Sequence, residues 1–116
     1  MSLEFTHKPN YFMFAQLLMR YVQQQTSSAA STLEVSMHDL SELFHHDTAS
    51  ITTNLDSILN IADEYKVETV QGDQKIIESY SKDSTQQVLI LKLNAEAMKS
   101  LSDGKRLIEP NATDYN

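Results

Sequence analysis

Residues 66–93, KVETVQGDQKIIESYSKDSTQQVLILKL, decide the fold class of this chain. The stretch holds three segments rich in β-branched and aromatic side chains, at 66–71, 75–80 and 86–93. Turn-forming residues separate the segments, namely Gly72-Asp73 and KDST at 82–85. The stretch therefore predicts a β-hairpin or a three-stranded meander. Both faces of its last segment are apolar, so we expect cover on both sides of that strand.

Upstream of this stretch, apolar residues recur at the spacing of amphipathic helices. Residues 11–25 predict a first helix, with Asn10 as its N-cap. Leu33 and Val35 alternate with polar residues, as in a short strand. Ser36 then caps a two-turn helix over 37–44, with Asp39 three positions on.

A third helix follows the interruption at His45-His46, is capped by Asp47 or Thr48, and ends near Tyr65. After the β-rich stretch, Asn94 caps a last short helix that reaches Leu101, and Gly104 provides its stop signal.

Taken in order, the elements are helix, short strand, helix, helix, β-hairpin and helix, an α+β arrangement. This order is the plan of a winged helix-turn-helix domain, in which the short strand is free to pair beside the hairpin, or wing. We predict an N-terminal arm over 1–9, the domain over 10–104 and a C-terminal tail over 105–116.

The bulk composition indicates one soluble domain. A chain of 116 residues with 41% hydrophobic and 22% charged side chains forms a single core. It has no cysteine, which excludes disulfides and thiolate chemistry and favours a cytoplasmic location. The longest apolar stretch, residues 11–19, is far shorter than a membrane span, so we expect no membrane contact.

The charge of the chain argues against strong DNA binding. The net charge is −7, and residues 36–66 contain six acids against one base, Lys66. DNA phosphates are neutralised by clustered Lys and Arg. DNA contact, if the domain makes any, is predicted to be weak and to use the start of the third helix and two wing lysines: Ser50, Thr52, Thr53, Asn54, Lys75 and Lys82.

The sequence contains no pattern for catalysis, a cofactor or a metal ion. It lacks a glycine-rich phosphate loop, H-E-x-x-H and G-x-S-x-G. His38 and His45 are two helical turns apart, about 10 Å of rise, which is too far for both rings to reach one ion. The adjacent His45 and His46 point to different sides. We therefore expect no enzyme activity.

The first helix is apolar over more than the one stripe that a core requires. Either the rest of a small domain wraps around this helix, or part of its surface faces a partner. The residues predicted for a dimer or partner interface are Tyr11, Phe12, Phe14, Leu18 and Tyr21.

Three segments resemble the N-terminal winged-helix domain of plasmid replication initiator proteins: LLMRYVQQQ, LEVSMHDLSELF, and the hairpin and helix VETV…KIIESY…VLILKLNAEAMKSL. The resemblance covers roughly residues 10–101 and is one of pattern, without a diagnostic motif. Those initiators usually carry a second winged helix with basic DNA-reading residues, which this chain lacks. The resemblance implies at most the half that mediates dimerisation and modulates DNA contact.

Three functions fit the sequence. The first is a self-associating interaction module in a replication or transcription regulatory system, a homodimer or the protein partner in a DNA-associated complex. The second is a sequence-specific regulator whose dimer gathers Lys8, Arg20, Lys75 and Lys82 into one basic surface. The third is an acidic inhibitor that occupies the basic nucleic-acid-binding surface of a partner.

Overall fold

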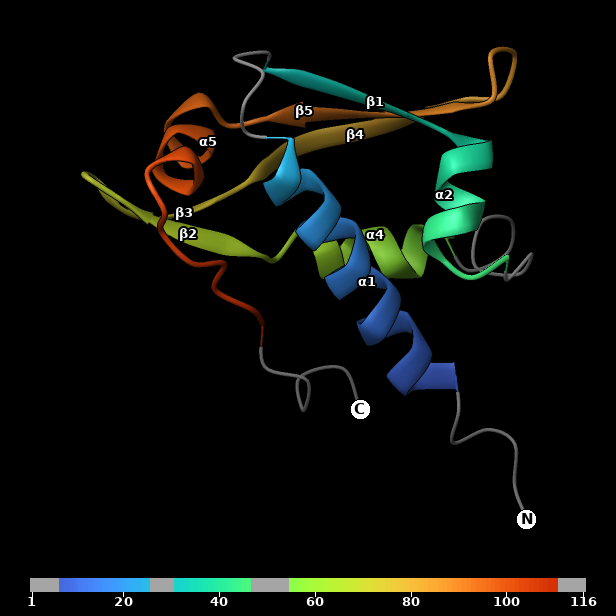
Figure 1. Ribbon diagram of the computed structural model, residues 1–116, viewed down its shortest axis with the longest axis horizontal. Coiled ribbons are helices and arrows are strands. Elements are labelled where there is room, and N and C mark those ends of the chain that lie inside the picture. Colours follow the sequence, from blue (N-terminus) through green and yellow to red (C-terminus); the bar gives the residue numbers. More distant parts are fainter. Residues whose placement is uncertain (1–6, 26–30, 47–54, 111–116) are drawn as a thin grey trace.

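The protein is an α+β domain with a small antiparallel sheet. The computed structural model describes residues 7–25, 31–46 and 55–110, with side chains described from Tyr11 onward. Figure 1 shows the arrangement of its helices and strands. In chain order the described elements are α1 (His7–Gln24), β1 (Thr32–Ser36), α2 (Met37–Leu43), α4 (Leu55–Ala62), β2 (Lys66–Thr69), β3 (Gly72–Lys75), β4 (Ile77–Asp83), β5 (Val88–Leu93) and α5 (Ala95–Ser102).

The main sheet has three antiparallel strands in the order β1-β5-β4. Leu91 lies at its centre, paired with Leu33 of β1 on one side and Tyr80 of β4 on the other. The short strand predicted at 33–36 therefore forms and pairs beside the last strand of the chain, as the sequence suggested. A register shift between Ile77 and Ser79 interrupts β4 near its start.

The β-rich stretch forms two sheets, and the single meander was a wrong expectation. The first part of the segment predicted at 66–71 forms β2. It pairs with β3, a strand that the sequence does not predict, and the two strands make a separate hairpin. The turn lies two residues earlier than predicted. The side chain of Thr69 closes it, donating to the Gly72 carbonyl at 2.7 Å and accepting from the Gln71 amide at 3.1 Å. Gly72 leaves the turn with φ +105°, which favours glycine.

Ile76 is the hinge between the two sheets. Its amide donates to the Tyr65 carbonyl at 3.2 Å, and its carbonyl accepts from the Asn94 amide at 2.8 Å. These bonds tie the residue to the chain before β2 and after β5, so β3 cannot continue straight into β4. The β2–β3 hairpin extends to one end of the molecule (Figure 1), where Val70 at its tip is 93% exposed.

The core lies between one face of the main sheet and the two helices α1 and α4, which lie on the same side of it (Figure 1). Phe14 of α1 stacks on Phe44 at the end of α2, with ring centroids 4.9 Å apart. The sheet contributes alternate residues of β5, as the two-residue period of a strand requires. The buried apolar side chains of these elements include Leu18, Met19, Val22, Val35, Leu55, Ile58, Leu59, Leu89, Leu91 and Leu93.

Helix α1 begins at His7 and already includes Asn10, so the predicted N-cap at Asn10 was wrong. Pro9 explains why the helix begins before Asn10. A proline in the first turn needs no hydrogen-bond acceptor for its missing N–H, and its fixed φ suits a helix. The predicted arm over 1–9 therefore overlaps the helix by three residues.

Three other helix-end predictions are confirmed, while the predicted cap at Asp47 or Thr48 lies outside the described residues. Ser36 caps α2 by accepting from the Asp39 amide at 3.0 Å. Asn94 caps α5 by accepting from the amides of Glu96 and Ala97. Gly104, with φ +97°, follows the end of α5 and donates its amide to the Leu101 carbonyl. The predicted tail also begins in contact with the domain, since Ile108 forms a β-bridge with Lys66.

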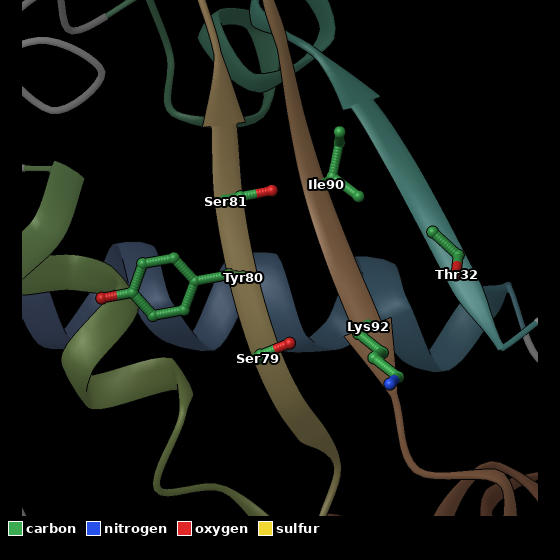
Figure 2. Close-up of a pocket in the computed structure, with 6 residues that line it drawn as sticks. All are labelled: Thr32, Ser79, Tyr80, Ser81, Ile90 and Lys92. Carbon is green, nitrogen blue, oxygen red and sulfur yellow. The ribbon is translucent and has the colours of Figure 1, made fainter.

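The two faces of β5 differ, so the expected cover on both sides is only half present among the described residues. Leu89, Leu91 and Leu93 are buried against the helices. Val88 and Ile90 on the other face are only half-buried, and Figure 2 shows α1 passing behind the strands, away from the Ile90 side chain. None of the described helices is long and apolar enough to cross a bilayer.

Candidate functional site

The outer side of α4 carries a row of polar contacts that we call the α4 seam. Leu55, Ile58, Leu59 and Ala62 bury the inner side of this helix, which turns Asp56 and Asn60 outward by helical spacing. Asp63 and Glu64 continue the row just after the helix ends. Strands β3 and β4 supply the opposing side chains, Lys75, Tyr80 and Lys82.

Each contact of the α4 seam joins the helix to the β-rich half of the chain. Lys82 Nζ lies 2.9 Å from Asp56 Oδ1. One turn along, the Tyr80 hydroxyl donates to Asn60 Oδ1 at 3.2 Å. At the end of the row, Lys75 Nζ lies 3.2 Å from Asp63 Oδ2 and 3.4 Å from Glu64 Oε2. The seam therefore tethers the outer side of α4 to β3 and β4.

The electrostatics of the α4 seam favour the charged form of Lys75. The hydrogen bond from Lys75 to Asp63 raises the pKa of the Lys75 ammonium above its usual 10.5, and the charges of Asp63 and Glu64 add to this effect. Two ammonium groups face three carboxylates, so the seam has a net negative charge. Both lysines are partly open to water, with side chains 44% and 39% exposed.

The predicted DNA contacts fall into two groups. Ser50, Thr52, Thr53 and Asn54 lie outside the described residues. Lys75 and Lys82 lie in the α4 seam, each paired with carboxylates of the same chain. A phosphate would have to compete with those carboxylates. The sequence alone does not reveal these pairings, because the partners are 11 to 26 residues apart and meet only through the fold.

The predicted partner residues on α1 differ in how deeply they are buried. Phe14 and Leu18 are buried in the core, with 5% and 0% of their surface exposed, so no partner reaches them in this conformation. Tyr11, Phe12 and Tyr21 are partly buried at the edge of the core.

A second row of α1 offers an apolar surface outside the core. Met13, Leu17 and Tyr21 are spaced four residues apart, which places them on one side of the helix. Met13 is 41% exposed, and the other two are partly buried. We call this row the α1 stripe. The four-residue spacing of the α1 stripe can be read from the sequence. Because α1 is apolar over a wide surface, however, the sequence does not show which of its apolar residues face the core.

Three ionisable side chains meet on α2. His38, Asp39 and Glu42 have ligand-type atoms within 4.8 Å of one another, and His38 Nε2 lies 3.5 Å from Glu42 Oε2. All three are exposed, so water competes with any ion for these groups. The two histidines after the helix end it in the left-handed region, with φ 58° at His45 and 62° at His46. They form the polar turn that the sequence predicted.

Comparisons with known proteins assign no family, relative or structural neighbour to this chain. No protein-family model matches the chain, and no curated protein or solved structure is significantly similar to it.

Proposed function

We propose that the chain is a winged-helix interaction module that self-associates within a replication or transcription regulatory assembly, and that binds DNA weakly or not at all. We further propose that it acts in the cytoplasm, without catalytic activity.

The order of helices and strands supports the winged-helix part of this proposal. Strand β1 pairs beside the β4–β5 hairpin, and α2 and α4 precede that hairpin in the chain, as in the helix-turn-helix plan. The loop over 84–87 then corresponds to the wing. The β2–β3 hairpin is an addition to that plan, inserted between α4 and β4.

The observation that carries the functional proposal is the α4 seam. A helix that enters the major groove presents its outer side to bases, while nearby lysines and arginines hold phosphates. Here the outer side of α4 shows carboxylates, and the two nearest lysines are already paired with them. This arrangement repels phosphate and favours a module that contacts protein.

The α1 stripe supports self-association. An apolar row that the core leaves partly exposed lowers the free energy of a complex when a partner buries it. A second copy of the chain offers the same row, as a two-fold symmetric dimer requires.

Light scattering of the purified chain tests this proposal. We expect a mass of about twice 13.2 kDa at micromolar concentration. Met13→Glu places a charge in the α1 stripe at an exposed position and should shift the mass to that of the monomer. Gln86→Glu adds the same charge at an exposed position in the loop between β4 and β5, away from α1, so it should leave the dimer unchanged.

Two results would overturn the proposal. One is a monomeric wild-type chain at high micromolar concentration. The other is tight binding to random duplex DNA with a steep negative dependence on salt, which would show that several phosphates are neutralised and favour the sequence-specific regulator instead.

A further inference from the structure

The outer face of the main sheet carries a cluster of hydroxyl groups around one lysine. Alternate residues of a strand share a face, so the strand register defines cross-strand rows on this side. One row is Thr32, Lys92 and Ser79, since Lys92 pairs with Thr32 on β1 and with Ser79 on β4. The next row places Ile90 between Glu34 and Ser81.

Between these rows the sheet is hollowed into an open groove of about 260 Å³, lined by Thr32, Ser79, Tyr80, Ser81, Ile90 and Lys92. Figure 2 shows the hydroxyls of Ser79 and Ser81 directed toward β5, while the Tyr80 ring points the other way, toward α4. The groove thus has three hydroxyls and one ammonium at its walls and the Ile90 side chain in its floor.

The charge of this groove is the opposite of that of the α4 seam. Its lining contains one cation and no carboxylate. Among the described residues, Lys75, Lys82 and Lys105 have a carboxylate within 4 Å, whereas Lys92 has none. A lysine ammonium and serine and threonine hydroxyls are all hydrogen-bond donors, and together they match the oxygens of an anion.

We propose that this groove binds a phosphate group. The ammonium of Lys92 supplies the charge, and the hydroxyls of Thr32, Ser79 and Ser81 donate to the phosphate oxygens. The volume lies just below the range of about 300–1,000 Å³ typical of pockets for drug-sized ligands, so the groove fits a phosphate and a few attached atoms but not a nucleotide. Glu34 stands beside Ile90 in the neighbouring row without lining the groove, and its charge opposes the binding of an anion.

This inference is independent of the proposed self-association, because α1, which carries the α1 stripe, lies behind the sheet on the side away from the groove (Figure 2). The phosphate is either free or carried by a phosphomonoester, such as a phosphorylated side chain. Both sources present the same oxygens to Lys92.

Two-dimensional NMR of the full chain tests the proposal. Inorganic phosphate, O-phosphoserine and acetate are titrated separately at constant ionic strength, against chloride. We expect saturable shifts of the Ser79, Ser81 and Lys92 amides with both phosphate probes. Tighter binding of O-phosphoserine identifies a phosphomonoester as the ligand, and equal binding identifies the free group.

The matched variants are Lys92→Gln and Lys99→Gln. Loss of a hydrogen bond to a charged group weakens binding by about tenfold or more, so Lys92→Gln should abolish saturation in the millimolar range. Lys99 is an exposed lysine of α5 outside the groove, and its replacement should change nothing. The dispersion of the spectra shows directly that both variants are folded.

Three results would overturn the assignment. Shifts that rise linearly without saturation indicate general screening by the added ion. Equal losses in both variants show that only the net charge matters. Acetate binding as tightly as phosphate shows that the groove does not select a phosphate group.

Discussion

Single polar side chains fix the ends of several elements in this chain. Ser36, Thr69 and Asn94 each satisfy backbone groups where a helix begins or a hairpin turns. Such residues act over two or three positions, and this short range is why the sequence identifies Ser36 and Asn94 as caps. Asn10 has the same side chain as Asn94 but lies inside α1, because Pro9 allows the helix to begin earlier.

The Asn94 cap yields a prediction at this scale. Asn94→Ala removes the acceptor for two amides at the start of α5 and should lower the free energy of unfolding by about 1 kcal/mol. Urea denaturation followed by circular dichroism measures this loss. Asn94→Asp keeps the acceptor and removes only the amide that donates to Gln74 Oε1 at 3.2 Å, so it should lose less. Equal losses in the two variants would show that the bond to Gln74, and not the cap, stabilises α5.

At the scale of elements, sequence pattern identifies each described helix and four of the five described strands. Strand β3, Gly72–Lys75, escaped prediction because its residues are polar and exposed, and only pairing with β2 makes them a strand. The division into two sheets was not predicted either, because it depends on hydrogen bonds of Ile76 to distant parts of the chain. Local pattern therefore predicted four of the strands and the pairing of β1 beside the hairpin, but it could not predict that β2 and β3 pair apart from the main sheet.

The candidate site was less predictable than the fold for the same reason. The sequence predicts weak DNA contact by Lys75 and Lys82 as wing lysines. The structure places both against α4, where Asp56, Asp63 and Glu64 lie. A charge pair of this kind depends on tertiary contact and leaves no periodic signal in the sequence.

The pairing of Lys75 predicts a dependence of stability on pH. Because the folded chain raises the pKa of Lys75, the pair stabilises the fold below pH 10.5, and this contribution is lost as the pH rises through the folded pKa. The contribution should be smaller than about 1 kcal/mol, since the side chain is partly open to water. Lys75→Met lacks it, so the stability difference between wild type and variant should shrink from pH 8 to pH 11.

Urea unfolding of both proteins across this range gives the difference directly, and ionisation of the tyrosines cancels between them. Lys66→Met serves as the control, because Lys66 is exposed and none of the ion pairs among the described residues includes it. A constant difference between wild type and Lys75→Met would show that the methylene chain of Lys75, and not its charge, stabilises the junction.

At the scale of the whole molecule, positive and negative groups are distributed unevenly over a chain whose net charge is −7. The α4 seam combines two lysines with three carboxylates, while the groove on the outer face of the sheet presents one lysine and three hydroxyls. A long-range field that repels DNA is thus compatible with a small local site for an anion. The α4 seam joins α4 to β3 and β4, whereas the groove lies on the outer face of the main sheet, and Tyr80 of β4 borders both.

This distribution predicts how DNA binding could be created. The triple variant Asp56→Asn, Asp63→Asn, Glu64→Gln keeps the size of each side chain and changes the net charge of the chain from −7 to −4. It frees the ammonium groups of Lys75 and Lys82 on the outer side of α4. If carboxylate pairing is what prevents contact with phosphates, the variant should bind random duplex DNA at low salt where the wild type does not. Fluorescence anisotropy over a salt series should give a slope of log affinity against log salt near −2, since each phosphate neutralised contributes about −0.9.

The matched control for this prediction is Glu78→Gln, Glu96→Gln, Asp103→Asn, which makes the same change in net charge at exposed positions away from the α4 seam. Binding by the seam variant alone assigns the effect to Lys75 and Lys82, because the average field of the two proteins is the same. Equal binding by both variants would assign it to net charge and would show that pairing within the α4 seam does not limit DNA binding. The comparison therefore separates local pairing from long-range repulsion, which the wild-type chain always presents together.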